Sequence, residues 1–137
     1  MNEHIAKFLR EKGFQDVKVA SVSGVVDVKG SKHNYHIAVE SRGTRSATHQ
    51  DDKVFDSSQL YMHVVEQVGD LMQHSQAQSG TLLFMGNPDI PRIRHQVAKI
   101  DKSLDRLEFV RLWVQKDGTV LVEAPKEMAS TLQKLGI

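Results

Sequence analysis

The sequence predicts a mixed α/β fold in which helices cover both faces of a central sheet, and three observations carry this. Three short runs rich in β-branched residues follow one another between residues 16 and 41. Apolar residues recur at helical spacing before and after these runs. A predicted helix also separates the third run from the apolar run at 81–86, which implies a crossover and parallel pairing. We expect the order αβββαβ followed by αββα.

The N-terminal elements are predicted from caps, periodicity and turn residues. A short helix is expected at 3–12, because Asn2 is a good N-cap and Gly13 suits the C-terminal end. The three strands are expected in the runs "DVKVASV", "GVVDVKG" and "NYHIAVES", with "GSKHN" as a hairpin loop. A polar loop then leads to a helix that starts near Asp56 or Ser57 and carries an apolar stripe of Leu60, Val64, Val68, Leu71 and Met72.

The C-terminal elements follow the same logic. The run "TLLFMG" is uniformly apolar, which indicates a strand buried on both faces. Pro91 can open one helix with an apolar face and a basic face. That basic face could follow a phosphate backbone, or it could simply be solvated. The Lys116-Asp117-Gly118 turn predicts a hairpin, and a last helix is expected at about 125–135.

Composition places the chain among ordinary globular proteins. Its 137 residues suit one domain, and its apolar and charged contents are 39% and 26%. The absence of cysteine excludes thiol chemistry, cysteine-bound zinc and disulfides. The net charge of +1 gives no global argument for nucleic acid. No apolar run approaches ~20 residues and no secretory h-region is present, so a cytoplasmic location and no membrane partner are expected.

Two acidic residues near strand ends are the candidates for chemistry. Strand alternation places Asp27 on one face with Lys29, and Glu40 on one face with Arg42. A hairpin centred near residues 31–33 would set Asp27 opposite 34–36, which leaves Glu40 several residues away at ~3.4 Å per residue. On that register one metal ion could not bridge them without a bulge or a splayed pair. The plain alternative is a strand that meets water, with a surface ion pair worth ~0–1 kcal/mol.

The element order and these residues resemble the restriction-endonuclease-like PD-(D/E)xK nucleases, in particular the Mrr-type and Holliday-junction-resolvase-like branches. The resemblance covers about residues 3–86, with 87–137 as an extension. It rests on "VVDVKG" and "YHIAVESR", in which twelve residues separate Asp27 from Glu40. It implies that Asp27, Glu40 and the carbonyl of Ser41 hold Mg²⁺ or Mn²⁺. Such hard cations prefer oxygen ligands, and they activate water for phosphodiester hydrolysis.

The motif lysine is replaced by Arg42, which is the main departure from that family. Arginine can clamp a phosphate, but it is a poor proton acceptor because its pKa stays above ~12. Lys29 is a possible substitute. The resemblance also implies accessory roles for Gln59 on the following helix and for Glu11 on the first helix, although both fit ordinary polar helix faces.

Two functions follow from the residues and the resemblance. The first is metal-dependent hydrolysis of DNA, with Arg42, Arg45 and Lys53 as nucleic-acid contacts. Asp51 and Asp52 keep the local positive excess small. The second is a catalytically degenerate module that binds nucleic acid or a protein. A homodimer would suit this activity, because cutting two strands needs two sites and the C-terminal hairpin offers a sheet edge.

Overall fold

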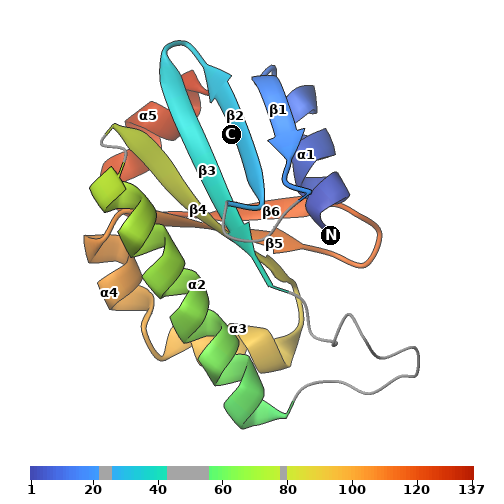
Figure 1. Cartoon of the computed structure of the whole chain (residues 1–137), viewed down its shortest axis with the longest axis vertical. Coiled ribbons are helices and arrows are strands. Elements are labelled where there is room, and N and C mark those ends of the chain that lie inside the picture. Colours follow the sequence, from blue (N-terminus) through green and yellow to red (C-terminus); the bar gives the residue numbers. More distant parts are fainter. Residues whose placement is uncertain (22–25, 43–55, 78–79) are drawn as a thin grey trace.

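The computed structural model describes residues 1–21, 26–42, 56–77 and 80–137, and its centre is a six-stranded mixed sheet (Figure 1). The strands lie in sequence order, with antiparallel pairing at both ends and two parallel pairs, β3–β4 and β4–β5, in the middle. This confirms the mixed α/β fold. The strands are β1 (Gln15–Val19), β2 (Val28–Lys32), β3 (Tyr35–Ser41), β4 (Thr81–Pro88), β5 (Phe109–Val114) and β6 (Val120–Glu123).

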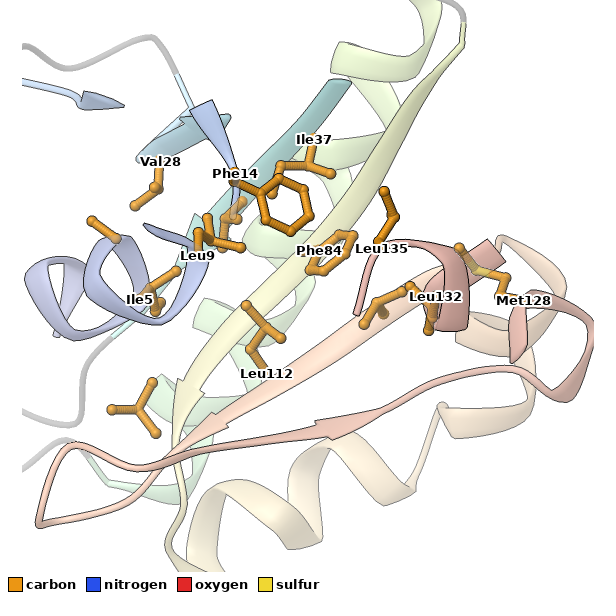
Figure 2. Packing of buried hydrophobic residues seen from close by; sticks show 14 residues of the cluster. Ile5, Leu9, Phe14, Val28, Ile37, Phe84, Leu112, Met128, Leu132 and Leu135 are labelled. Atoms are coloured by element: carbon orange, nitrogen blue, oxygen red, sulfur yellow. The ribbon is translucent and has the colours of Figure 1, made fainter. Parts of the chain in front are cut away.

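Helices cover both faces of the sheet and create two cores. On one face, α1 (Asn2–Glu11), the 3₁₀ turn η1 (Lys126–Met128) and α5 (Ala129–Lys134) pack on the strands. Figure 2 shows this core, in which Ile5 and Leu9 of α1 lie on one side of Phe84 and Leu135 after α5 lies on the other. On the other face lie α2 (Ser57–Ala77), α3 (Pro91–Ala98) and α4 (Asp101–Arg106). No helix in the described ranges is long and apolar enough to cross a membrane.

The turn between β2 and β3 is tighter than expected, and this corrects the predicted register. The turn residues are His33 and Asn34, both with positive φ (51° and 70°), which is typical of a two-residue hairpin. Gly30 to Lys32, assigned to the loop from the sequence, are paired residues of β2. Val28 therefore pairs with Val39. Continuing this register by one residue beyond the start of β2 places Asp27 opposite Glu40 rather than opposite residues 34–36. No bulge in this hairpin is required.

Two predicted helices differ from those observed. The helix expected after Pro91 is divided into α3 and α4, because the backbone leaves helical geometry at Ile100 (φ −130°, ψ 15°). The bend lets Ile93, Val97 and Leu104 all reach the core. The basic residues of this segment therefore do not form one continuous helical face. The last helix begins with a 3₁₀ turn and continues as α5.

Candidate functional site

The end of β3 sends successive side chains to opposite faces of the sheet. Ile37, Val39 and Ser41 point toward α1, where the Ser41 hydroxyl contacts the amide oxygen of Asn2. Ala38 and Glu40 point toward α2. Glu40 is a buried acid at this position, only 5% exposed. Burial of an ionisable side chain is costly unless partners compensate, so its neighbours decide what the site can do.

Asp27 joins this site from the residue just before β2. Its Oδ2 accepts a hydrogen bond of 2.8 Å from the backbone N–H of Ser41, and its own carbonyl accepts one of 2.8 Å from Ala20. The corrected register sets Asp27 beside Glu40. The two acids singled out from the sequence therefore converge at one point of the sheet.

The Arg42 guanidinium lies between these oxygens. Its Nη1 donates to the Ser41 carbonyl at 2.8 Å and to Glu40 Oε2 at 3.2 Å, and it lies 3.8 Å from Asp27 Oδ2. Its Nη2 donates to Asp70 Oδ2 of α2 at 2.8 Å. Nη1 thus faces three oxygen atoms, one from each of Ser41, Glu40 and Asp27. Nη2 is bound by a fourth oxygen, from Asp70.

Gln67 of α2 secures the backbone under this cluster. Its side chain is fully buried, and Nε2 donates to the carbonyls of Glu40 (2.8 Å) and Gly86 (3.1 Å). It therefore links α2 to adjacent residues of β3 and β4. Its Oε1 has no hydrogen-bond partner within the described part of the chain.

Gln59, the accessory glutamine expected from the sequence, lies at the start of α2 and does not join this cluster. Gln59 is exposed and exchanges two hydrogen bonds of 2.8 Å with Asp56, so the two residues form a capping box in which Asp56 caps the start of α2. A sequence signal for Gln67 existed, because it lies on the same buried stripe as Leu60, Val64 and Leu71. A polar side chain within a buried apolar stripe needs a hydrogen-bond partner inside the protein. For Gln67 these partners are backbone carbonyls near the ends of β3 and β4.

The environment shifts the ionisation of both central residues. Burial, reinforced by the charge of Asp27, raises the pKa of Glu40 to about 7, while the hydrogen bond and charge of Arg42 oppose this shift. Burial lowers the pKa of Arg42, but its hydrogen bonds to Asp70 and Glu40 outweigh burial and raise the pKa above its ordinary value. Glu40 is therefore an acid that exchanges its proton near neutral pH, and Arg42 is a permanent cation.

The donor set fits a hard divalent cation. Asp27, Glu40 and the Ser41 carbonyl supply only oxygen ligands, which hard divalent cations prefer. The positively charged Nη1 of Arg42 contacts all three of these oxygens. No group of three or more His, Cys, Asp or Glu side chains in residues 1–21, 26–42, 56–77 and 80–137 is arranged to hold a metal. A metal at this site would therefore need the peptide carbonyl and water as well as the two acids.

A solved structure resembles most of the chain. It is an XisH family protein from Nostoc punctiforme PCC 73102, and the match covers 92% of this chain and 100% of that one. The sequence identity is 12% and the TM-score is 0.48, so the likeness supports no argument about function. No family model matches the chain, and no curated protein matches its sequence.

The remaining predicted site residues lie apart from this cluster or outside the described residues. Glu11 is exposed on α1 and pairs with Lys7 at 3.9 Å, so it does not join the acids. Lys29 is exposed and forms no ion pair with Asp27 or Glu40 in the described structure. Instead, burial and the charge of Lys29 lower the pKa of His74 on α2. Arg45 and Lys53 lie outside the described residues.

Proposed function

We propose that this protein hydrolyses DNA phosphodiester bonds in a metal-dependent reaction, as a nuclease of the restriction-endonuclease-like class. The observation that supports it most is the convergence of three oxygen donors, from Asp27, Glu40 and Ser41, on one cationic nitrogen. The element order from α1 to β4 is the αβββαβ order on which the resemblance rests. Both acids stand at the ends of the two strands that this resemblance requires.

Each residue has a role in the proposed reaction. Asp27, Glu40 and the Ser41 carbonyl would hold Mg²⁺ or Mn²⁺. When bound, such an ion polarises the phosphodiester and lowers the pKa of the attacking water. Arg42 would contact the scissile phosphate with its guanidinium, and Gln67 holds the ends of β3 and β4 in place beneath the acids.

The charges around Arg42 favour a metal-dependent reaction over metal-free phosphate binding. Three carboxylates, from Asp27, Glu40 and Asp70, surround this one guanidinium. Even with Glu40 protonated, two negative charges oppose one positive charge. A phosphodiester is itself an anion, so this set would repel it until a divalent cation is added.

The second candidate function is a catalytically degenerate module that binds nucleic acid or a protein. The observation that favours it is the position of Arg42, which already neutralises the acids that would hold a metal. Arginine is also unable to act as a proton acceptor in place of the motif lysine. Such a module would contact DNA through a surface other than this acidic cluster.

A plasmid-nicking assay separates the two candidates. Wild-type protein, Asp27→Ala and Glu40→Ala are incubated with supercoiled DNA and Mg²⁺ or Mn²⁺, with EDTA as a blank. Glu11→Ala is the matched control, because Glu11 is an exposed acid remote from the cluster. Nicking that needs metal, is lost in both site variants and is kept in the control supports the nuclease.

Absence of nicking by the wild-type protein under every metal condition contradicts the nuclease. A retention assay at low salt then tests the module, which predicts equal DNA retention by wild-type protein and both site variants. Cleavage of both strands would in turn support the proposed homodimer, since each strand needs its own site.

A further inference from the structure

We propose that the Arg42 guanidinium and a divalent metal ion are alternative occupants of the same three-oxygen position. Arg42 would fill the position when no metal is bound, and would be released toward a phosphate when a metal enters. The identity of the metal rests on the proposed function above. The competition itself rests on the contacts of Arg42.

The contacts of Nη1 show why both occupants do not fit together. Nη1 lies 2.8 Å from the Ser41 carbonyl, 3.2 Å from Glu40 Oε2 and 3.8 Å from Asp27 Oδ2. A divalent ion bound to the same oxygens sits ~2.0–2.6 Å from each of them. That places the ion in the volume of Nη1 and beside a second positive charge. One of the two cations must therefore leave.

Asp70 gives the guanidinium a second anchor outside that position. It binds Nη2 at 2.8 Å from α2, and its side chain is 46% exposed, whereas the Glu40 side chain is 7% exposed. Arg42 can therefore withdraw Nη1 from the buried oxygens while Nη2 stays on Asp70. We assign Asp70 as a positioning residue that holds Arg42 at the site and serves as its pivot when a metal enters.

Calorimetric titration with Mn²⁺ tests this competition without any cleavage step. Removing the resident charge in Arg42→Ala should tighten Mn²⁺ binding by about tenfold or more, because the ion no longer displaces a cation. Arg106→Ala is the matched control, because Arg106 is an exposed arginine of α4. The Mn²⁺ affinity of this control variant should equal that of the wild type. Adding Glu40→Gln to Arg42→Ala should abolish the gain, which assigns the gain to this site.

Asp70 is tested in the same titration. Asp70→Asn removes a nearby negative charge and also the partner of the displaced guanidinium, so Mn²⁺ binding should weaken more in the wild-type background than in the Arg42→Ala background. Equal losses in the two backgrounds would show that Asp70 is not the pivot of Arg42. Equal Mn²⁺ affinities for wild type and Arg42→Ala overturn the competition, as does a gain that survives Glu40→Gln. If Arg42→Ala does not fold by circular dichroism, Arg42→Gln, which keeps a hydrogen-bonding side chain without the charge, provides the same comparison.

The two proposals fail in different ways. A Mn²⁺ gain in Arg42→Ala with no DNA cleavage by any variant overturns the nuclease and supports the competition. Metal-dependent cleavage by the wild type, together with an unchanged Mn²⁺ affinity in Arg42→Ala, supports the nuclease and overturns the competition.

Discussion

The backbone N–H of Ser41 donates a 2.8 Å hydrogen bond to the carboxylate of Asp27, across the open end of the β2–β3 hairpin. This bond keeps Asp27 beside Glu40, although twelve residues lie between them in the chain. It also gives Asp27 two separable contributions, one as a hydrogen-bond acceptor and one as a negative charge. Substitutions can distinguish them.

Asp27→Asn and Asp27→Ala should differ in stability while both lose metal-dependent activity. Asparagine keeps an oxygen that can accept from Ser41, whereas alanine leaves that N–H without its acceptor at a cost of about 1 kcal/mol. Chemical denaturation of both variants measures the difference. Equal destabilisation by the two substitutions would show that the hydrogen bond contributes nothing.

Glu40 should make the free energy of unfolding depend on pH between about 4.5 and 7. The folded protein retains a proton on Glu40 up to about pH 7, whereas the unfolded chain releases it near 4.5. The folded state therefore binds more protons across this window. The stabilisation is fully present below pH 4.5 and is lost as pH rises through 7, with a total of no more than about 3 kcal/mol.

Denaturation at several pH values, with Glu40→Gln as the comparison, checks this dependence. Glutamine cannot ionise, so the slope that Glu40 contributes should disappear in the variant. A wild-type slope that is unchanged in Glu40→Gln would mean that other groups cause it.

Gln67→Met should destabilise the fold more than Gln59→Ala, although both remove a glutamine from α2. Loss of the Gln67 amide leaves two carbonyls, of Glu40 and Gly86, without this buried donor, which costs about 1–3 kcal/mol. Gln59→Ala removes only an exposed acceptor of the Asp56 N–H, and such surface substitutions usually change stability by about 0.5 kcal/mol or less. Thermal unfolding of the two variants ranks them, and the reverse ranking would refute the structural role of Gln67.

Gly86→Ala should be destabilising because α1 approaches this residue closely. A Cβ at position 86 would lie 2.6 Å from Ile5 Cδ1, and Ile5 is fully buried, so about 1–3 kcal/mol of overpacking is expected. Ile5→Val removes that methyl group, and the double variant should lose less stability than the two single losses combined. Strict additivity in a denaturation cycle would show that the two positions do not collide.

The fold was predictable where local chemistry and topology agree. β-Branched runs and the helix between β3 and β4 were enough to indicate the mixed sheet, because a crossover helix implies parallel pairing. The break between α3 and α4 was not predictable, since the apolar spacing continues through Ile100 and only the packing bends the backbone there.

Three residues of the candidate site were predicted from the sequence, but its geometry and the contributions of Gln67 and Asp70 were not. Asp27, Glu40 and Arg42 were identified from their order along the chain. Their convergence depends on a two-residue turn at His33 and Asn34, and a histidine with positive φ has no strong sequence signature. Asp70 was not assigned a role because its partner, Arg42, comes from a segment distant in sequence.

Because side chains of β3 alternate between the two faces of the sheet, one register positions both the acid of the candidate site and a valine of the core. Val39 faces the core beneath α1, and Glu40 faces α2 on the opposite side. Inserting or deleting one residue in the β2–β3 hairpin would reverse these directions for a whole strand. The carboxylate would be driven into hydrocarbon while valine took its place, so a shifted hairpin would fail to fold instead of producing an inactive protein. A variant that keeps the fold and loses this site is therefore expected to differ in side chains and not by a one-residue shift of the β2–β3 register.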